Sequence, residues 1–328
     1  MNVPCVRVPR EQGESVRQAL ADIDALAKEF KIEATDEWVY IPITAENEIP
    51  ETYDIVSRTP ERRTQQTLPH DLLSYEPSYE RLGHIGLIDE EDPERAQAIA
   101  DALIASDIPL TGVLNRQSNI RGDYRIREWD QLAGETTETR HREFGAEFIV
   151  DVTKTYFSPR LATERHRVIQ QVTAGERVLD MFAGVGPFII PMAMRGAEVV
   201  GVDMNEAAIT YLKKNADVND VAERVEAIHG DVREVAASYP GWADRIIMNL
   251  PHSADDFLPN AGIVASDSCR LHYYDIQHED APFEPGEKAI RSALGDEYQV
   301  VVDNRHVVRS YAPHEVNICL DVDLNAKE

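Results

Sequence analysis

Val178-Leu-Asp-Met-Phe-Ala-Gly-Val-Gly-Pro-Phe188 is an apolar segment that runs into a glycine-rich turn, and a second apolar segment ends in Val200-Gly-Val-Asp-Met-Asn205. Gly184 and Gly186 carry no Cβ, so the backbone can turn sharply there and approach a ligand closely. A glycine pair alone would indicate no more than a tight turn. Asp203, however, ends the second segment, where dinucleotide-binding folds place a carboxylate that binds the ribose hydroxyls. The two segments therefore predict a cradle for a nucleotide-like cofactor, with the next helix offering its free N–H groups to an anion.

The rest of this half of the chain alternates strand and helix patterns, which indicates a parallel sheet. A helix is expected from Asn205 to Asn219, because Asn205 suits an N-cap and the centre is rich in alanine. Two long β segments follow, Tyr298 to Ala312 and Glu315 to Leu324, the last of them antiparallel. The earlier strands are expected at 177–182, 198–203, 224–230, 244–249 and 269–275. The predicted fold class is α/β with a Rossmann-like sheet.

Residues 1–150 form a different part of the chain, in which we expect two small α+β domains. The first, residues 1–60, has strand patterns at Val3–Val8 and Glu37–Ile43 and a helix pattern from about Glu11 to Phe30. A segment rich in proline and charge, Glu48 to His70, is typical of a linker.

The second small domain is expected at residues 71–150. It has a strand pattern at Leu82–Ile88, an amphipathic helix pattern at Asp92–Ser106 and a β-rich end over residues 122–150. Residues 151–328 are then the domain that contains the Rossmann-like sheet.

The composition is that of a globular protein, since 328 residues with 43% hydrophobic content can bury a large core. No apolar run approaches the roughly 18 residues that span a bilayer, and the N-terminus has no signal-peptide pattern. We therefore expect a cytoplasmic protein without a membrane partner. Cys5, Cys269 and Cys319 lie far apart and share no metal-ligand spacing, so neither a metal site nor a disulfide framework is expected.

The net charge is −26, with 59 acidic residues against 33 basic ones, and only seven of the basic residues are lysine. Such a surface is unfavourable for nucleic acid at low salt, because phosphate contacts need cations. It suits molar salt, in which screening shortens charge repulsion to about 3 Å. The charge predicts a halophilic host and leaves room for a polyanionic partner that meets locally clustered arginines.

Two further polar residues follow predicted strands. Asp231, after Gly230, can accept a hydrogen bond from an adenine amino group, although it can equally be a helix N-cap. Asn249, in Asn249-Leu-Pro251, places an amide at the carboxyl edge of the sheet, where α/β folds bind ligands. A plain turn of Asn and Pro is the alternative there.

A third segment, Tyr156-Phe-Ser-Pro-Arg-Leu-Ala-Thr-Glu-Arg165, lies just before the glycine turn. Its helix is expected to begin after Pro159, and a spacing of four then puts Arg160 and Glu164 on one helix face. From the spacing alone, a surface salt bridge between these two side chains is the simplest interpretation.

Taken together, these segments resemble the archaeal and eukaryotic type of tRNA (guanine-37-N1)-methyltransferase, a family that uses S-adenosylmethionine (SAM). The resemblance rests on 156–165, 180–188, Gly230-Asp-Val-Arg-Glu234 and Asn249-Leu-Pro251. It extends to Tyr79-Glu-Arg-Leu-Gly-His-Ile-Gly-Leu-Ile88 and Val308-Arg-Ser-Tyr-Ala-Pro313, so it covers the chain from about residue 70, and the first 60 residues match only loosely.

The resemblance implies how the residues divide the reaction. N1 of guanine carries a proton at neutral pH, so methylation needs a general base, for which Glu164 is our choice, and a donor for the charge that builds on O6. An arginine of the second domain is expected as that donor, Arg125 in preference to Arg127. Asn249 is expected to bind the guanine edge or the cofactor, while Tyr156, Arg160 and Pro251 line the pocket for the base. The residues expected to bind SAM are Arg165, Asp180, Phe182, Gly184, Gly186, Asp203, Met204, Asp231, Val232 and Asn249.

The implied partner is tRNA, and the implied assembly is a monomer. A base beside the anticodon is stacked, so it must be flipped into the pocket. The two small domains would bind tRNA by its shape, with splayed loop bases read individually. Phosphate contacts are expected from four arginines of the second domain, each of which could instead be only a counter-charge on this acidic surface: Arg116, Arg121, Arg140 and Arg142.

Three alternatives compete with this interpretation. A relative with the same SAM cradle transfers an aminocarboxypropyl group in wyosine-type tRNA modification, but it targets a carbon, for which Glu164 would not be needed. A form that methylates both guanine and a wyosine precursor carries Asn-Pro-Pro-Tyr, whereas this chain has Asn249-Leu-Pro-His252. A non-catalytic SAM- or tRNA-binding module would have no use for Glu164, Arg160 and Asn249 together.

Overall fold

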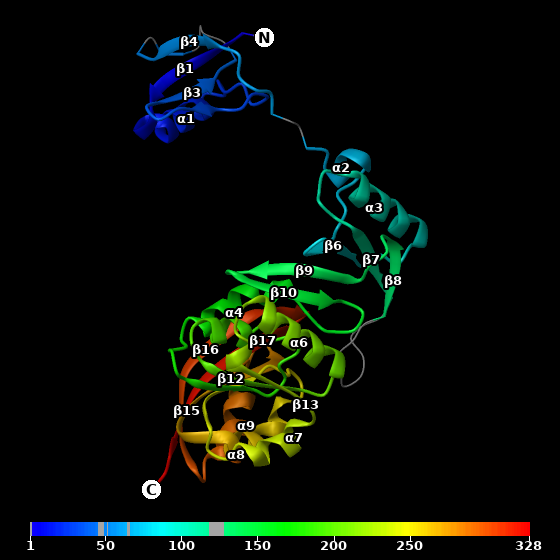
Figure 1. The fold of residues 1–328 in the computed structure, drawn as a ribbon, viewed down its shortest axis with the longest axis vertical. Helices are drawn as coiled ribbons and strands as arrows, with labels where there is room; N and C mark the ends of the chain where they lie inside the picture. The colour runs from blue at the N-terminus through cyan, green and yellow to red at the C-terminus, as the bar shows by residue number, and fades with distance from the viewer. Residues whose placement is uncertain (1, 45–48, 51, 64–65, 118–127) are drawn as a thin grey trace. The chain divides into compact units, whose positions relative to one another are not determined.

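The structure, a computed structural model, describes residues 2–44, 49–50, 52–63, 66–117 and 128–328 (Figure 1). The chain divides into two compact units, Met1–Leu68 and Pro69–Glu328. No helix in these described ranges is long and apolar enough to cross a membrane.

In the part of the first unit that the structure describes, a four-stranded antiparallel sheet carries one α-helix, α1 (Gly13–Asp22). Val16 and Leu20 of the helix pack on Val6 and Ile41 of the sheet, which gives the unit its own apolar core. The strand order is β2 (Glu33–Ala34), β3 (Trp38–Pro42), β1 (Val3–Pro9), β4 (Asp54–Arg58).

Two expectations for this unit were wrong. The helix ends at Asp22 and does not reach Phe30, because Asp24 adopts a left-handed conformation with φ 52°. The N–H groups of Asp24 and Ala25 then bond back to the carbonyls of Ala21 and Leu20, which closes the helix in a Schellman motif. The segment expected to be a linker contains β4, which pairs with β1 at the edge of the sheet. Its strand pattern was not recognised because the segment is rich in polar residues.

The second unit begins with α2 (Pro69–Leu72) and a four-stranded sheet that carries α3 (Pro93–Ala105). The predicted helix is confirmed, with Asp92 as its N-cap. The single strand expected at Leu82–Ile88 is instead a hairpin, because Gly83 turns with φ 58° and a Cβ there would lie 2.2 Å from a backbone oxygen. The strand order is β5 (Glu80–Leu82), β6 (Ile85–Ile88), β7 (Gly112–Arg116), β8 (Trp129–Ala133).

A seven-stranded sheet dominates this unit and confirms the predicted Rossmann-like α/β fold. Its first five strands are parallel, and β17 is antiparallel to both of its neighbours, as expected for the last strand. The order is β13 (Val225–His229), β12 (Glu198–Asp203), β11 (Arg177–Asp180), β14 (Ala243–Met248), β15 (Ala265–His278), β17 (Glu315–Ala326), β16 (Tyr298–Ala312).

Helices cover both faces of this sheet, and each face has its own apolar cluster. One cluster includes α4 (Ala162–Ile169), α5 (Ile189–Met194) and α6 (Glu206–Val218), the last capped by Asn205 as predicted. The other includes α7 (Val232–Val235), α8 (Leu258–Val264) and α9 (Glu284–Leu294). Because these strands are parallel, the loops that lead from a strand to the next helix gather at the carboxyl edge of the sheet.

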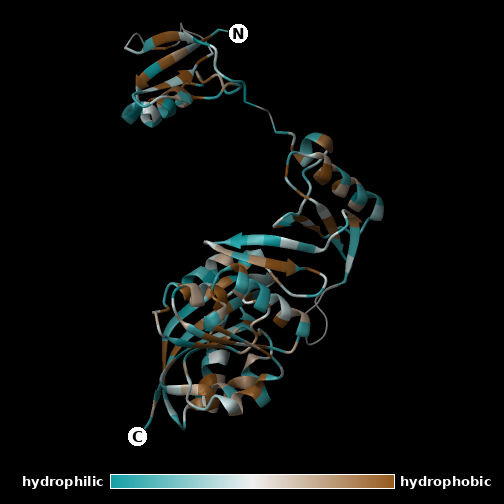
Figure 2. Cartoon of the chain, in the orientation of Figure 1, coloured by the Kyte–Doolittle hydropathy of each residue, from teal (hydrophilic) through white to brown (hydrophobic). Residues whose placement is uncertain are grey.

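A hairpin of β9 (Glu138–Glu143) and β10 (Ala146–Asp151) packs on the first face. Figure 2 shows β10 mostly hydrophobic and β9 mostly hydrophilic. The hydrophobic strand faces the core, where Phe148 and Val150 are fully buried. The fully buried amide of Asn215 in α6 accepts from the Ile149 N–H at 2.7 Å and donates to the carbonyls of Ile149 and Val185. One side chain thus joins the hairpin to the glycine turn.

Candidate active site

A cavity of about 690 Å³ lies at the carboxyl edge of the seven-stranded sheet. Loops that follow β11, β12, β13 and β14 contribute to its wall, which is where open α/β sheets bind ligands. Its volume falls in the range for a small-molecule or cofactor site. The predicted site residues that line it are Tyr156, Arg165, Phe182, Gly184, Asp203, Met204, Asp231, Val232, Asn249 and Pro251.

The two glycines of the turn have different places in the structure. Gly184 has φ 54°, and a Cβ added there would meet nothing within 4 Å, so its backbone borders open space in the cavity. Gly186 has φ 88° but does not line the cavity. A Cβ on Gly186 would lie 2.4 Å from Leu212, so this glycine allows the turn to pack against α6.

Asp203 stands where a ribose-binding carboxylate was predicted. Its two oxygens accept the N–H groups of Gly184 and Asn205, each at 2.8 Å, which fixes the carboxylate in the cavity wall. Burial raises the pKa of Asp203, and these two hydrogen bonds act against the rise. Each oxygen keeps a lone pair that can accept from a ligand hydroxyl.

Asp180 lies behind the turn and does not line the cavity. Its side chain is buried and accepts the N–H of Phe182 at 3.1 Å. Burial, with a further contribution from the nearby charge of Asp203, raises the pKa of Asp180 to about 7. In this structure Asp180 shapes the turn from within.

Asp231 lines the cavity and is also the N-cap of α7, where it accepts the N–H of Arg233 at 2.9 Å. The guanidinium of Arg233 bonds the same carboxylate and lowers the pKa of Asp231. The capping interpretation is confirmed, and a role toward adenine stays a prediction.

The segment after β14 brings Asn249 and Pro251 to the cavity, followed by His252. His252 has φ 82°, a conformation rare for a residue with a side chain, and its ring lies 5.5 Å from that of Tyr311. Such backbone strain collects at ligand sites. Sequence reasoning did not assign a role to several further lining residues, of which Arg309 and Tyr311 lie in the Val308–Pro313 motif: His252, Asp256, Phe257, Arg309, Tyr311 and Asn317.

Glu164, the predicted base, is buried beside the cavity but is not among its lining residues. Arg167 donates to both of its carboxylate oxygens, and the Tyr274 hydroxyl donates to one of them at 2.8 Å. His306 lies 3.3 Å from the other oxygen. The structure thus places Glu164 in a hydrogen-bond network of residues that do not themselves line the cavity.

The network continues to Asp321, which accepts from Arg167 and, at 2.6 Å, from His272 Nδ1. Burial works against the charge of Asp321, but hydrogen bonds from His272 and Arg167 hold its pKa far below the ordinary value. His272, Asp321 and Cys319 are close enough together to resemble metal ligands. Their hydrogen bonds to one another and to Arg167 account for the cluster without an ion.

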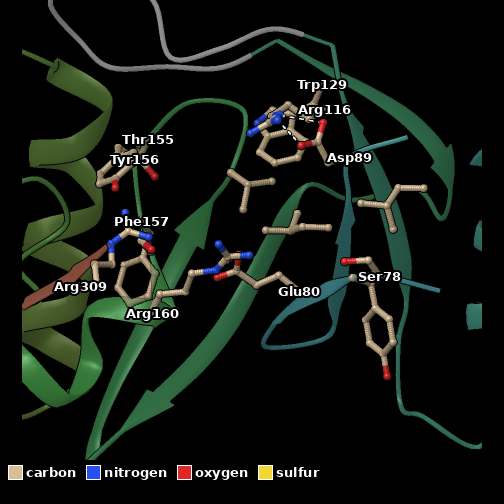
Figure 3. A pocket seen from close by; sticks show the side chains of 15 residues that line it. Ser78, Glu80, Asp89, Arg116, Trp129, Thr155, Tyr156, Phe157, Arg160 and Arg309 are labelled. Atoms are coloured by element: carbon tan, nitrogen blue, oxygen red, sulfur yellow. Dashed lines mark hydrogen bonds and ion pairs between the residues drawn. The ribbon is translucent and has the colours of Figure 1, made fainter. Parts of the chain in front are cut away.

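Arg160 and Glu164 do not share a helix face, so that expectation was wrong. Pro159–Leu161 form a 3-10 turn before α4, which rotates Arg160 away. Arg160 pairs instead with Glu80 of β5 at 3.0 Å, as Figure 3 shows, and lines a second, smaller cavity.

Arg165 is almost fully buried and reaches the cavity from α4. It bonds Glu143 of β9 through two nitrogens, at 3.0 and 2.5 Å, and the Ser158 carbonyl at 3.0 Å. Burial disfavours the charge of Glu143, yet hydrogen bonds from His141 and Arg165 lower its pKa. The pair fixes the wall of the cavity to the hairpin.

The structure describes only some of the arginines predicted to act from the second domain. Arg121, Arg125 and Arg127 lie outside the described residues. Arg140 and Arg142 are exposed on β9 and share Glu147 as their partner. Arg116 pairs with Asp89 and lines the smaller cavity.

Residues 139–301 match the model of the TRM5/TYW2 methyltransferase domain, and residues 5–51 match that of the tRNA methyltransferase 5 N-terminal domain. A protein of Pyrococcus abyssi named tRNA (guanine(37)-N(1))-methyltransferase Trm5b is 39% identical over 96% of this chain and 97% of its own length. The chain belongs to the Trm5 family of tRNA (guanine(37)-N(1))-methyltransferases. Membership in the Trm5 family extends to the first 60 residues, which the sequence motifs matched only loosely.

This Trm5-family chain is also similar to a solved tRNA complex and to an enzyme with a different reaction. The solved complex structure of aTrm5 and tRNALeu has 30% identity and a TM-score of 0.74, covering 98% of this chain and 99% of that one. A Pyrococcus horikoshii protein named tRNA(Phe) (4-demethylwyosine(37)-C(7)) aminocarboxypropyltransferase is 30% identical over 78% of this chain and 92% of its own length. The Trm5 relative matches more of the chain, including its N-terminal unit.

Proposed function

We infer that this chain transfers a methyl group from SAM to N1 of guanine 37 in tRNA. The observation that carries the inference is one cavity that joins a nucleotide cradle, Gly184 and Asp203, to Asn249 and Tyr156, in a chain of the Trm5 family. SAM supplies an electrophilic methyl group when bound, and the residues of this chain orient it and handle the proton.

The cavity wall suits the parts of SAM. The fixed carboxylate of Asp203 can accept both ribose hydroxyls, and the backbone at Gly184 leaves space for a ligand. Met204 and Val232 offer apolar surface for the adenine ring, and Asp231 an acceptor for its amino group. We assign the cofactor to this side and the target base to the side of Tyr156, Asn249 and Pro251.

We keep Glu164 as the general base that takes the N1 proton. It is one residue from Arg165, which lines the cavity, and it is shielded from water. Both of its oxygens accept hydrogen bonds from Arg167, so catalysis requires Glu164 to turn toward the cavity. Arg167 also bonds Asp321, and it would therefore keep a carboxylate partner when Glu164 leaves.

The donor to the developing charge on O6 is proposed to be Arg125, in agreement with the family resemblance. Asn249 would bind the guanine edge, because its amide can both donate and accept. The two small domains, at 1–60 and 71–150, are proposed to bind the tRNA. Arg140 and Arg142 are proposed to contact its phosphates. The protein is proposed to act as a cytoplasmic monomer.

The test is transfer of labelled methyl from SAM, in about 2 M KCl, to tRNA transcripts with guanine or adenine at position 37. We expect incorporation that depends on guanine and that falls in Glu164→Gln by roughly 10²- to 10⁴-fold, the share of a general base. Glu176→Gln is the matched control, because Glu176 is a partly buried partner of an arginine, Arg245, and lies outside the cavity. A Glu164→Gln variant as active as Glu176→Gln would remove Glu164 from the role of base.

The second candidate is aminocarboxypropyl transfer, which the P. horikoshii relative favours. Mass spectrometry of the nucleosides from the same reaction separates the two, since one product carries a methyl group and the other an amino acid chain. SAM binding without methylated guanine would favour this candidate or a non-catalytic module.

A further inference from the structure

The smaller cavity, of about 200 Å³, lies between the β5–β8 sheet and the segment that follows β10 (Figure 3). Its volume is below the usual range for a drug-sized ligand, so it can hold one ring system of modest size. The rings of Trp129 and Phe157 line it, and Figure 3 shows them on opposite sides, Trp129 near Arg116 and Phe157 near Arg309. The cavity thus offers flat apolar surfaces to a planar group.

Three polar atoms of this cavity are buried and have no hydrogen-bond partner among the described residues. They are Glu80 Oε1, Trp129 Nε1 and Arg309 Nε. A buried polar atom without a partner is costly, and native structures supply a partner in water or a ligand. One acceptor and two donors around flat apolar surfaces suit the edge of a nucleobase, which carries both kinds of group.

The charge of this cavity is also unusual for the chain. Its lining has three arginines, Arg116, Arg160 and Arg309, against two carboxylates, Glu80 and Asp89. The first two arginines pair with those carboxylates, whereas Arg309 has no ion-pair partner within the described ranges. In a protein of net charge −26, a local excess of cation marks a place for an anion.

The two cavities share a wall. Tyr156, Phe157, Ser158 and Arg309 line both of them. A guanine bound in the larger cavity would therefore have its neighbour in the chain of RNA within reach of the smaller one. The phosphate that joins the two nucleotides would pass along the shared wall, where Arg309 stands.

We propose that the smaller cavity holds the base of a nucleotide next to guanine 37, and that Arg309 binds the phosphate between the two. The proposal rests on the inferred methyl transfer to guanine 37. Trp129 stacks on the adjacent base, and the free oxygen of Glu80 accepts a hydrogen bond from it. The enzyme thereby holds two consecutive nucleotides, which positions guanine for reaction.

The test measures methylation of three tRNAs: intact, without a base at position 36, and without a base at position 38. With wild-type enzyme, loss of one of the two bases should lower kcat/KM on the order of ten-fold, the effect of one stacked base. Trp129→Ala should show a similar loss on intact tRNA and no additional loss on the tRNA that lacks that base. Trp129→Phe keeps a ring and removes the N–H, so it separates stacking from hydrogen bonding if Trp129→Ala folds poorly.

Trp242→Ala is the matched control, because Trp242 is half-buried and lines neither cavity. Its effect should add to that of the missing base, whereas the effect of Trp129→Ala should not. A neutral methylphosphonate can replace the phosphate between guanine 37 and the neighbouring nucleotide whose base proves important. In the wild type this replacement should lower kcat/KM about as much as Arg309→Gln does on intact tRNA. The two changes together should lower kcat/KM no further than either change alone. Additive effects throughout, or no effect of either missing base on a wild type that methylates guanine 37, would overturn the proposal. A wild type without any methylation of guanine 37 would instead refute the function on which it rests.

Discussion

The guanidinium of Arg167 bonds both oxygens of Glu164, with Nε 2.8 Å from Oε2 and a second nitrogen 2.8 Å from Oε1. The same guanidinium bonds Asp321, so one cation compensates two carboxylates that are almost fully buried. Burial opposes the charge of Arg167, but the hydrogen bonds from it to Glu164 and Asp321 raise its pKa. The network therefore has a structural function, whatever part Glu164 takes in the reaction.

Arg167→Met should therefore destabilise the protein by roughly 3–5 kcal/mol, because it leaves two buried carboxylates without their cation. Urea unfolding in high salt measures the change. Arg177→Met is the control, since Arg177 and Asp244 form a more exposed pair that should cost no more than about 1 kcal/mol. Equal losses in the two variants would contradict the network.

Asp203→Ala should weaken SAM binding by at least about ten-fold, the loss of a good charge-assisted hydrogen bond. Isothermal titration calorimetry with SAM measures it without tRNA. Asp180→Asn is the comparison, because Asp180 does not line the cavity and asparagine can still accept the Phe182 N–H. Asp180→Asn should keep most of the affinity, and a loss as large as that of Asp203→Ala would place Asp180 in contact with the cofactor.

Asp180 should also make the free energy of unfolding depend on pH. Its pKa in the folded state is about 7, above the ordinary value of 3.8, so between these values the folded chain holds a proton that the unfolded chain releases. Stability therefore falls as pH rises from about 4 to about 7, by at most about 4 kcal/mol, and this group adds no slope outside that window. Asp180→Asn should flatten the curve in thermal unfolding and be more stable than wild type at pH 8; a parallel curve would mean that Asp180 is ionised throughout.

Gly184→Ala and Gly186→Ala should separate binding from folding. Both glycines have positive φ, so either alanine strains the backbone by about 1 kcal/mol. The new methyl at 186 also meets Leu212 in the core and should lower the melting temperature further, whereas the methyl at 184 points into open space and should weaken SAM binding more than stability. The reverse pattern would contradict the place of Gly184 in the cavity wall and of Gly186 against α6.

The acidic surface predicts dependence on salt. Folding and activity should be lost in dilute buffer and return in molar KCl, because screening removes the repulsion between like charges. Circular dichroism and methyl transfer over a range of KCl concentrations measure this. Full stability in dilute buffer would rule out the halophilic interpretation.

The sheet and its ligand-binding edge could be predicted because they depend on local patterns. Strand ends such as Asp203 and Asn249 meet at one edge whenever the strands are parallel, so their spacing along the chain is enough. The hairpin at Gly83 was missed because only Gly83 and His84 separate Leu82 from Ile85. A turn signal of one glycine between two apolar residues is too weak to end a predicted strand.

The partners of Glu164 could not be predicted in the same way. Tyr274 and His306 come from strands more than a hundred residues further along the chain, and only the packing of α4 on the sheet brings them together. Arg160 illustrates the same limit at short range. The spacing of four assumed α geometry, but the 3-10 turn at Pro159 directs Arg160 toward Glu80.

The buried amide of Asn215 limits how far the chain can be truncated from its N-terminus. Its hydrogen bonds run to Ile149 in the hairpin and to Val185 in the glycine turn. A fragment that begins at residue 151 would lack Ile149, leave that amide partly unsatisfied and expose the core under Phe148. The smallest autonomous catalytic piece must therefore start upstream of Ala146, with the hairpin kept as an integral part of the methyltransferase.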